Sequence, residues 1–235
     1  MKIVSIHQPE TFPYAGYFNK MLYAHEFIIL DNVQFKKNNY QNRNRIIHVG
    51  KPKWLTFPVD MTHRLESTIR DTRLADTVDW KSRNIKVLED AYKGSPYFKY
   101  HMPVLREIIE KSDDSLLHLN MAIIDYIRYC LDIDTPLVYA SQIDVSSHKS
   151  DLVFDLCKSV GADVYLSGQG GRDYLEKSRF EEADIEVLYQ SFDDSRTYQQ
   201  QTHEFTPYMS VIDILMNNTE EDARLYVERA FTYST

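Results

Sequence analysis

Apolar and polar positions alternate near the start of the chain in a way that predicts a strand, a turn, a helix and a second strand. Residues 2–6 form a short apolar-rich segment, and residues 27–30 are four apolar residues in a row. Between them, prolines and a glycine over 9–16 indicate a turn, and apolar residues at helical spacing over 17–24 indicate a helix. Continuous apolar runs are typical of strands buried on both faces of a parallel sheet.

The same alternation returns in the C-terminal part of the chain. Strands are predicted over 137–140, 164–166 and 185–189, and helices over 149–160, over 207–218 and from Glu220 onward. Gly161 follows the first of these helices, as expected at a helix end. The pattern predicts an α/β protein with a mostly parallel open sheet and flanking helices.

The middle of the chain has a different character. Over residues 78–133 the apolar residues keep helical spacing, with one interruption at Gly94 and Pro96 and a stop before Pro136. Ser115 or Asp114 is the expected N-cap of the last helix in this region. We therefore expect one domain over 1–235 with a helical subdomain over 78–133.

Length and composition narrow the class of protein. A chain of 235 residues and 27.7 kDa buries a sizeable core without disulfides, and its two cysteines, Cys130 and Cys157, fall on apolar helix faces. No apolar segment is long enough to span a bilayer, and the first residues do not read as a signal peptide. The expectation is a cytoplasmic protein without membrane insertion and without a metal site.

The charge is unevenly distributed. The chain carries a net charge of −8, which argues against a protein dedicated to duplex nucleic acid, yet residues 32–59 contain six Lys and Arg residues and no acid. Within this segment Asn42, Arg43 and Asn44 are adjacent, and an arginine can hold a phosphate with two hydrogen bonds. The segment predicts an anion site. The alternative is a solvated basic hairpin between strands near 33–35 and 54–57.

Polar residues follow both N-terminal strands. His7 and Gln8 come after the first and Asp31 after the second, and ligands of open parallel sheets bind at the carboxyl ends of the strands. Histidine titrates near neutral pH, which suits proton transfer. We expect His7, Asp31 and Arg43 to share one pocket. The alternatives are a structural histidine, an Asp31 that caps a turn, and a solvated Lys20.

A glycine-rich loop follows the strand at 164–166. The segment SGQGGRDYL holds Ser167, Gly168, Gly170 and Gly171, whose backbone amides could surround an anion. The loop matches neither the P-loop nor the dinucleotide fingerprint. It is either a ligand loop at the same crevice or a tight exit from the strand.

Several segments in fixed order resemble one family. HQPETFPYAGYFNK, LDNVQFKK, NRNRI, WLTFPV, YLSGQGGRDYL, TYQQQ and FTPYMSVIDILMNN are similar to the WbqC-like family of bacterial proteins, found with gene clusters for O-antigen and related sugars. One departure is Tyr14, where the family usually has an aromatic residue and often tryptophan. Carried over by position, the expected site residues are His7, Gln8, Lys20, Asp31, Gln34, Lys36, Asn42, Arg43, Asn44, Ser167, Gly168, Gly170, Gly171, Tyr174, Tyr198 and Gln200, with Asp213 as a further polar member.

The resemblance implies a glycine or acyl transferase that acts on a sugar. The acceptor would be the amine of an amino sugar, carried as a nucleotide-sugar, and the acyl donor an aminoacyl-tRNA or a thioester. For acyl transfer, His7 would be the general base and Asp31 its orienting partner, with Gln8 or the glycine-loop amides as oxyanion donors. Arg43, Lys36 and Asn44 would hold the diphosphate. Neither cysteine lies in a motif, so no protein nucleophile is expected.

Two other functions stay open at this point. The strand, turn and helix at the N-terminus also look like the start of adenylate-forming and nucleotidyl-transferring proteins, by analogy of fold alone. Such a protein would use ATP, with His7 and Lys20 at the phosphates, and release pyrophosphate. A non-catalytic nucleotide-sugar-binding protein would do neither. The sequence does not indicate an oligomeric state.

Overall fold

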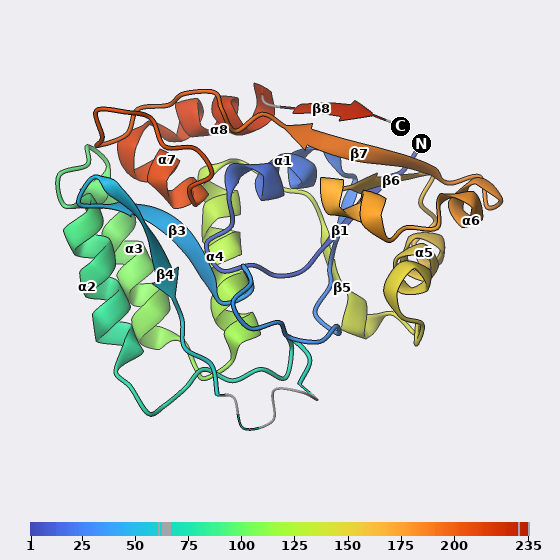
Figure 1. The fold of residues 1–235 in the computed structure, drawn as a ribbon, viewed down its shortest axis with the longest axis horizontal. Helices are drawn as coiled ribbons and strands as arrows, with labels where there is room; N and C mark the ends of the chain where they lie inside the picture. Colours follow the sequence, from blue (N-terminus) through green and yellow to red (C-terminus); the bar gives the residue numbers. More distant parts are fainter. Residues whose placement is uncertain (61, 63–66, 230, 235) are drawn as a thin grey trace.

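The fold is built on one central sheet, in a computed structural model that describes residues 1–60, 62, 67–229 and 231–234 (Figure 1). The sheet has six strands in the order β5-β2-β1-β6-β7-β8. All neighbours are parallel except β7 and β8. The predicted mostly parallel α/β fold is confirmed. The strands are β1 (Ile3–His7), β2 (Glu26–Ile29), β5 (Leu137–Tyr139), β6 (Val164–Ser167), β7 (Glu186–Phe192) and β8 (Phe231–Ser234).

Strand β1 lies at the point where the order of the sheet reverses. The chain moves from β1 outward through β2 to β5, then returns to β6 on the other side of β1 and continues to β7. The five parallel strands thus follow the order 3-2-1-4-5 of doubly wound folds, in which ligands bind at the carboxyl ends of the strands beside the reversal. Here the reversal places the end of β1 next to the end of β6.

Helices cover both faces of the sheet, because successive strand residues point to opposite sides. Phe27 and Ile29 of β2 pack into the cluster that contains α1, whereas Ile28 packs into the cluster that contains α5. Helix α8 packs against α1 on the first face, and α6 packs on the second with α5. These helices are α1 (Ala15–Tyr23), α5 (Lys149–Ser159), α6 (Lys177–Glu181) and α8 (Glu220–Arg229).

The middle of the chain forms α2 (Trp80–Tyr92), α3 (Phe98–Lys111) and α4 (Leu116–Cys130), as the helical spacing predicts. Ser115 caps α4 by accepting a hydrogen bond from the His118 amide. Helix α7 (Val211–Asn217) starts four residues later than predicted, because the Ser210 amide donates to the Arg45 carbonyl and the Ser210 side chain caps the helix. Among the described residues, no helix is long and apolar enough to cross a membrane.

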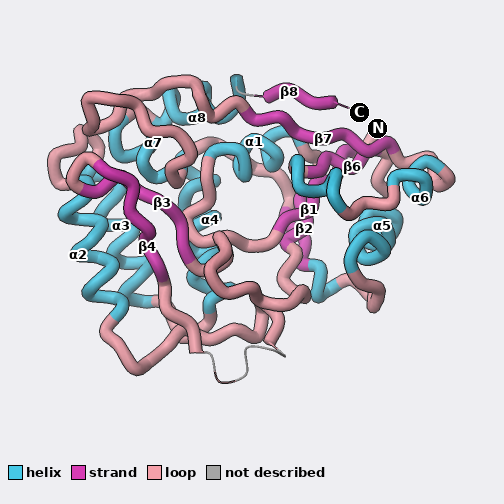
Figure 2. The backbone as a smooth tube through the Cα atoms, in the orientation of Figure 1, coloured by secondary structure: helices cyan, strands magenta, loops and turns pink. Residues whose placement is uncertain are grey.

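A separate antiparallel hairpin consists of β3 (Arg43–His48) and β4 (Lys51–Thr56) (Figure 2). Val49 and Gly50, both with positive φ, form its turn. A basic hairpin was one of the two sequence interpretations, but its first strand was placed wrongly at 33–35. The hairpin packs against α2 and α7, and its residues Ile46 and Leu55 are buried. This packing fixes the basic segment beside the sheet.

Candidate functional site

A cavity of about 440 Å³ lies at the carboxyl ends of β1 and β6, where the sheet order reverses. Five parts of the chain contribute to it: the loop after β1, the glycine loop after β6, strand β7, the segment before α7, and the hairpin with its preceding loop. Its walls combine aromatic rings with a few polar and charged groups, as is typical of small-molecule sites. The lining residues are His7, Glu10, Tyr14, Tyr40, Asn44, Arg45, Gly168, Gln169, Gly170, Gln190, Phe192 and Tyr208.

His7 is the last residue of β1 and presents a neutral imidazole to this cavity. Its Nδ1 lies 3.1 Å from the Gln8 carbonyl oxygen, which can only accept, so Nδ1 carries the proton and Nε2 has a free lone pair. Burial and the nearby Lys20 lower the pKa of His7 to about 3. The ring also packs edge-on against Tyr17, with centroids 4.9 Å apart. His7 is thus oriented and unprotonated at neutral pH.

Glu10 provides the carboxylate nearest to this ring. Its Oε1 lies 3.8 Å from His7 Nδ1, and burial raises the pKa of Glu10 to about 7, although Lys20 opposes the shift. Sequence reasoning did not select Glu10. The available signal was an acid three residues after a histidine, in the proline-containing turn that follows the first strand.

Lys20 lies on α1 and is buried, with only 1% of its surface exposed, so the solvated-surface alternative is wrong. Among the described residues, its Nζ has no hydrogen-bond partner. Nζ lies 3.7 Å from the point that a Cβ on Gly168 would occupy, so it reaches the glycine loop. Burial lowers the pKa of Lys20 to about 7, against the attraction of Glu10. An unpaired buried amine at this position can receive an anionic group of a ligand.

The glycine loop contributes unequally to the cavity. Gly168 and Gly170 line it. Gly171 does not, and its amide donates to the Gly168 carbonyl at 3.0 Å. A Cβ on Gly171 would collide with the Ser167 side chain, whereas a Cβ on Gly170 would meet nothing within 4 Å. The loop therefore reaches the crevice as expected, but Ser167 and Gly171 serve its internal structure.

The structure describes both Asp31 and Arg43, and neither of them lines the cavity. The Asp31 carboxylate accepts hydrogen bonds from the Ser141 amide at 2.9 Å and the Ser141 hydroxyl at 2.7 Å. Arg43 donates to the Asn38 carbonyl at 2.5 Å and stacks over Trp54. The expected pocket shared by His7, Asp31 and Arg43 is therefore wrong. Glu10 lies where a partner of His7 was expected, and Arg45 is the arginine that lines the cavity.

Side-chain amides of the N-terminal motifs hold the loops around the cavity. Gln8 Oε1 accepts a hydrogen bond from Gln41 at 2.7 Å. Asn42 donates to the Phe57 carbonyl and Asn44 to the Phe12 carbonyl, each at 2.9 Å. Of these residues, Asn44, the second residue of β3, also lines the cavity. These amides position the basic segment instead of facing the solvent.

Other expected site residues lie outside the cavity lining. Tyr198 donates to Asp213 Oδ2 at 2.9 Å, and Gln200 Nε2 donates to the same oxygen at 2.9 Å. Burial raises the pKa of Asp213 to about 6 in spite of these bonds. This network joins the segment before α7 to the helix itself. The remaining residues are Gln34, which forms a bridge with Thr68, Lys36, whose amide donates to Gln41, and Tyr174, which is half exposed.

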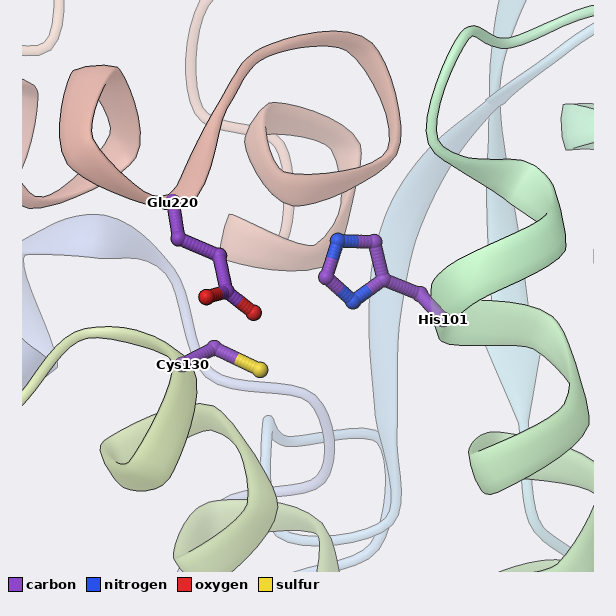
Figure 3. Close-up of side chains that lie close together, drawn as sticks. All are labelled: His101, Cys130 and Glu220. Atoms are coloured by element: carbon purple, nitrogen blue, oxygen red, sulfur yellow. The ribbon is translucent and has the colours of Figure 1, made fainter.

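A second group of ligand-type side chains lies at the junction of α3, α4 and α8 (Figure 3). The ligand atoms of His101, Cys130 and Glu220 lie within 4.8 Å of one another, and zinc accepts such donors. His101 Nδ1 forms a hydrogen bond with the Tyr126 hydroxyl at 2.7 Å, which leaves Nε2 as its possible ligand atom, and without a metal burial raises the pKa of Cys130 to about 12. None of the three residues lines the cavity.

The chain belongs to the WbqC-like protein family, which matches residues 8–225. It is similar to the uncharacterized protein Rv1507c of Mycobacterium tuberculosis, with 33% identity over 218 residues, which cover 92% of this chain and 94% of that protein. No solved structure gives a significant match. The family expected from the sequence motifs is confirmed, and its match begins directly after His7.

Proposed function

We propose that this protein is a transferase that joins an acyl or aminoacyl group, of the glycyl type, to the amine of an amino sugar carried as a nucleotide-sugar. One observation carries the proposal: a neutral, oriented His7 faces a cavity beside Glu10 and the unpaired Lys20. The family, with its expected link to O-antigen sugars, supports the substrate class.

The proposed reaction uses these groups in sequence. The sugar amine attacks the acyl carbonyl, and a new C–N bond forms while the carbonyl oxygen becomes an oxyanion. His7 Nε2 takes the proton from the attacking nitrogen. An imidazole whose pKa is lowered to about 3 is a weak base, so this step depends on the Glu10 carboxylate beside it, which favours the imidazolium. Collapse of the intermediate breaks the bond to the donor oxygen or sulfur, which receives the proton from His7.

Lys20, two amides of the glycine loop and Glu10 would stabilise the charges that develop. The Lys20 ammonium, next to the glycine loop, would face the oxyanion, and the amides of Gly168 and Gly170 would add hydrogen bonds. The Glu10 carboxylate, 3.8 Å from His7, would stabilise the transient imidazolium. Because the site is largely buried, these interactions are stronger than they would be in water.

The cavity suits a nucleotide-sugar in size and lining. Its volume of about 440 Å³ lies within the ~300–1,000 Å³ usual for ligand pockets. Tyr14, Tyr40, Phe192 and Tyr208 offer aromatic surface for sugar and base. Arg45 supplies a cation for the diphosphate, and its Nε, among the described residues, has no hydrogen-bond partner.

The test is a transfer assay read by mass spectrometry. A UDP-amino sugar is incubated with the protein and either glycyl-tRNA or a glycyl thioester, and the product is the sugar nucleotide heavier by one glycyl group. Product that depends on His7 supports the proposal. Absence of product with both donors, in the presence of folded protein, contradicts it.

A second candidate is favoured by the strand order. The reversal between β1 and β6 is the nucleotide site of doubly wound folds, so ATP could occupy the cavity and activate a carboxylate. Lys20 and the glycine loop would then hold phosphates. Release of pyrophosphate from ATP in the presence of an amino acid distinguishes this function, because the acyl transferase leaves ATP intact.

A further inference from the structure

One face of the β3–β4 hairpin carries aromatic and basic side chains toward solvent. Arg45 pairs with Trp54 across the hairpin, and Arg43, two residues away, lies on the same face. Trp54 is 41% exposed, as is Tyr40, and their rings lie 5.9 Å apart. The Arg43 guanidinium lies 4.2 Å from the Trp54 ring centre. We call Tyr40, Arg43, Arg45 and Trp54 the hairpin face.

The hairpin face lies within the basic segment of an acidic protein. Residues 32–59 contain six Lys and Arg residues and no acid, although the whole chain carries −8. Four of the six, Lys36, Lys37, Lys51 and Lys53, are exposed. None of the six forms an ion pair with a carboxylate among the described residues, whereas cations elsewhere, such as Lys111 and Arg224, do. A concentration of unpaired cations is the electrostatic signature of a polyanion site.

The hairpin face continues into the cavity. Tyr40 and Arg45 belong to both, so a ligand that contacts Trp54 can extend past them to His7. One nucleotide-sugar would occupy the cavity but would leave Trp54 and Arg43 without a role. The observations therefore favour a longer anionic ligand that enters the cavity with one end only.

We propose that the hairpin face binds single-stranded RNA, and that the acyl donor is an RNA that carries the acyl group at its 3′ end. This rests on the proposed acyl transfer. A terminal base would stack on Trp54 and Tyr40, and the phosphates before it would lie on Arg43 and Arg45 of the same face, as exposed aromatics and cations do in single-strand sites. The esterified 3′ hydroxyl is the leaving group: its C–O bond breaks as the new C–N bond forms, and the hydroxyl takes the proton.

The test is fluorescence anisotropy with a labelled single-stranded RNA that ends in CCA. We expect binding that weakens as salt rises. Trp54→Ala should weaken it roughly 5- to 150-fold, the range for one lost stacked base, whereas Trp54→Phe should largely restore it. Arg43→Gln should weaken binding and reduce its salt dependence, because Arg43 lies on the same face as Trp54. Melting curves establish that each variant is folded.

A matched control comes from α3, where Tyr100 is 73% exposed and follows the exposed Lys99. The pair Lys99→Glu with Tyr100→Ala should leave RNA affinity unchanged.

Absence of binding at low salt, or equal affinity of wild type and Trp54→Ala, would overturn the inference. If the protein transfers glycine from a thioester but does not bind RNA, the RNA donor is refuted and the proposed function is not. RNA binding without transfer from any donor would instead refute the proposed function.

Discussion

Oε1 of Glu10 lies 3.8 Å from Nδ1 of His7, three residues away along the loop that leaves β1. The relationship pairs a carboxyl group whose pKa is raised to about 7 with an imidazole whose pKa is lowered to about 3. Lys20 lowers the pKa of both, and burial accounts for the opposite directions. The three groups therefore form one electrostatic unit, in which His7 and Glu10 line the cavity and Lys20 is buried next to them.

Replacing His7 with Ala should reduce turnover of the transfer reaction by roughly 10² to 10⁴, the usual effect of a lost general base. KM for the nucleotide-sugar should change little, because the proposed ligand contacts come from Arg45 and the aromatic walls. His118→Ala, at an exposed histidine paired with Asp113, is the control and should keep full activity. Wild-type turnover in the His7 variant would leave His7 with a structural role only.

The pH profile of turnover should be bell-shaped with a maximum near pH 7. The acid limb appears as Glu10 becomes protonated below about 7, and the alkaline limb as Lys20 loses its proton above about 7. Since the two groups interact, the limbs report apparent values for the pair. Glu10→Gln should remove the acid limb, and Lys20→Met the alkaline limb, each with lower kcat. Unaltered profiles in both variants would refute these assignments.

Lys20→Met should raise the free energy of unfolding at pH 7 by on the order of 2 kcal/mol, because burial of this amine disfavours its charged form. The pKa of Lys20 is about 7 in the folded protein and 10.5 as the ordinary value. Between about pH 7 and pH 10.5 the unfolded chain therefore binds one more proton than the folded protein. Lys20 thus makes the free energy of unfolding increase with pH over this range. The free energy of unfolding gained by Lys20→Met, measured by urea denaturation, should be smaller at pH 9 than at pH 7. A constant difference would contradict the shift.

The two glycines of the loop should respond differently to substitution. Gly170→Ala should leave the melting temperature nearly unchanged and weaken ligand binding, since its Cβ meets no atom within 4 Å and the residue lines the cavity. Gly171→Ala should lower the melting temperature, because its Cβ would collide with Ser167 and lie 2.9 Å from Leu175. Calorimetry separates the two effects. The reverse order of melting temperatures would contradict the close packing of Gly171 against Ser167.

Tyr198→Phe should destabilise the protein by about 1–3 kcal/mol at pH 7, because it removes a donor to the buried Asp213 carboxylate. The pKa of Asp213 is raised to about 6 from an ordinary 3.8, so the folded protein holds the extra proton between these values. Stability from this group therefore falls as pH rises from about 4 to 6. Tyr129→Phe, at a tyrosine 82% exposed, is the control. A raised KM with unchanged stability would assign Tyr198 to the ligand instead.

The parallel strands β1, β2, β5, β6 and β7 could be predicted because local patterns indicate them. Strand β8 was missed, since a helix was expected from Glu220 onward and β8 forms by long-range antiparallel pairing with β7. Apolar runs such as 27–30 require burial on both faces, and the strands alternate with helices. The carboxyl edge then follows from topology, which is why His7 and the glycine loop were correctly expected at one crevice. The late start of α7 was not predictable, because it depends on the long-range bond from Ser210 to Arg45.

The partners of individual polar residues were harder to predict. Asp31 follows its strand as expected, yet Ser141, 110 residues away, takes both its oxygens. Arg43 and Arg45 are two residues apart, and only the packing of the hairpin decides that Arg45 lines the cavity. The motif residues Tyr198 and Gln200 pair with Asp213, so their place in a motif reflects the network around α7.

We propose that the cavity between the ends of β1 and β6 is the active site. A crystal structure of the protein with a UDP-amino sugar tests it most directly. We expect density with the sugar amine near His7 Nε2, the diphosphate at Arg45, and the glycine loop alongside. Density for the nucleotide-sugar at another surface, with an empty cavity at saturating ligand, would contradict it.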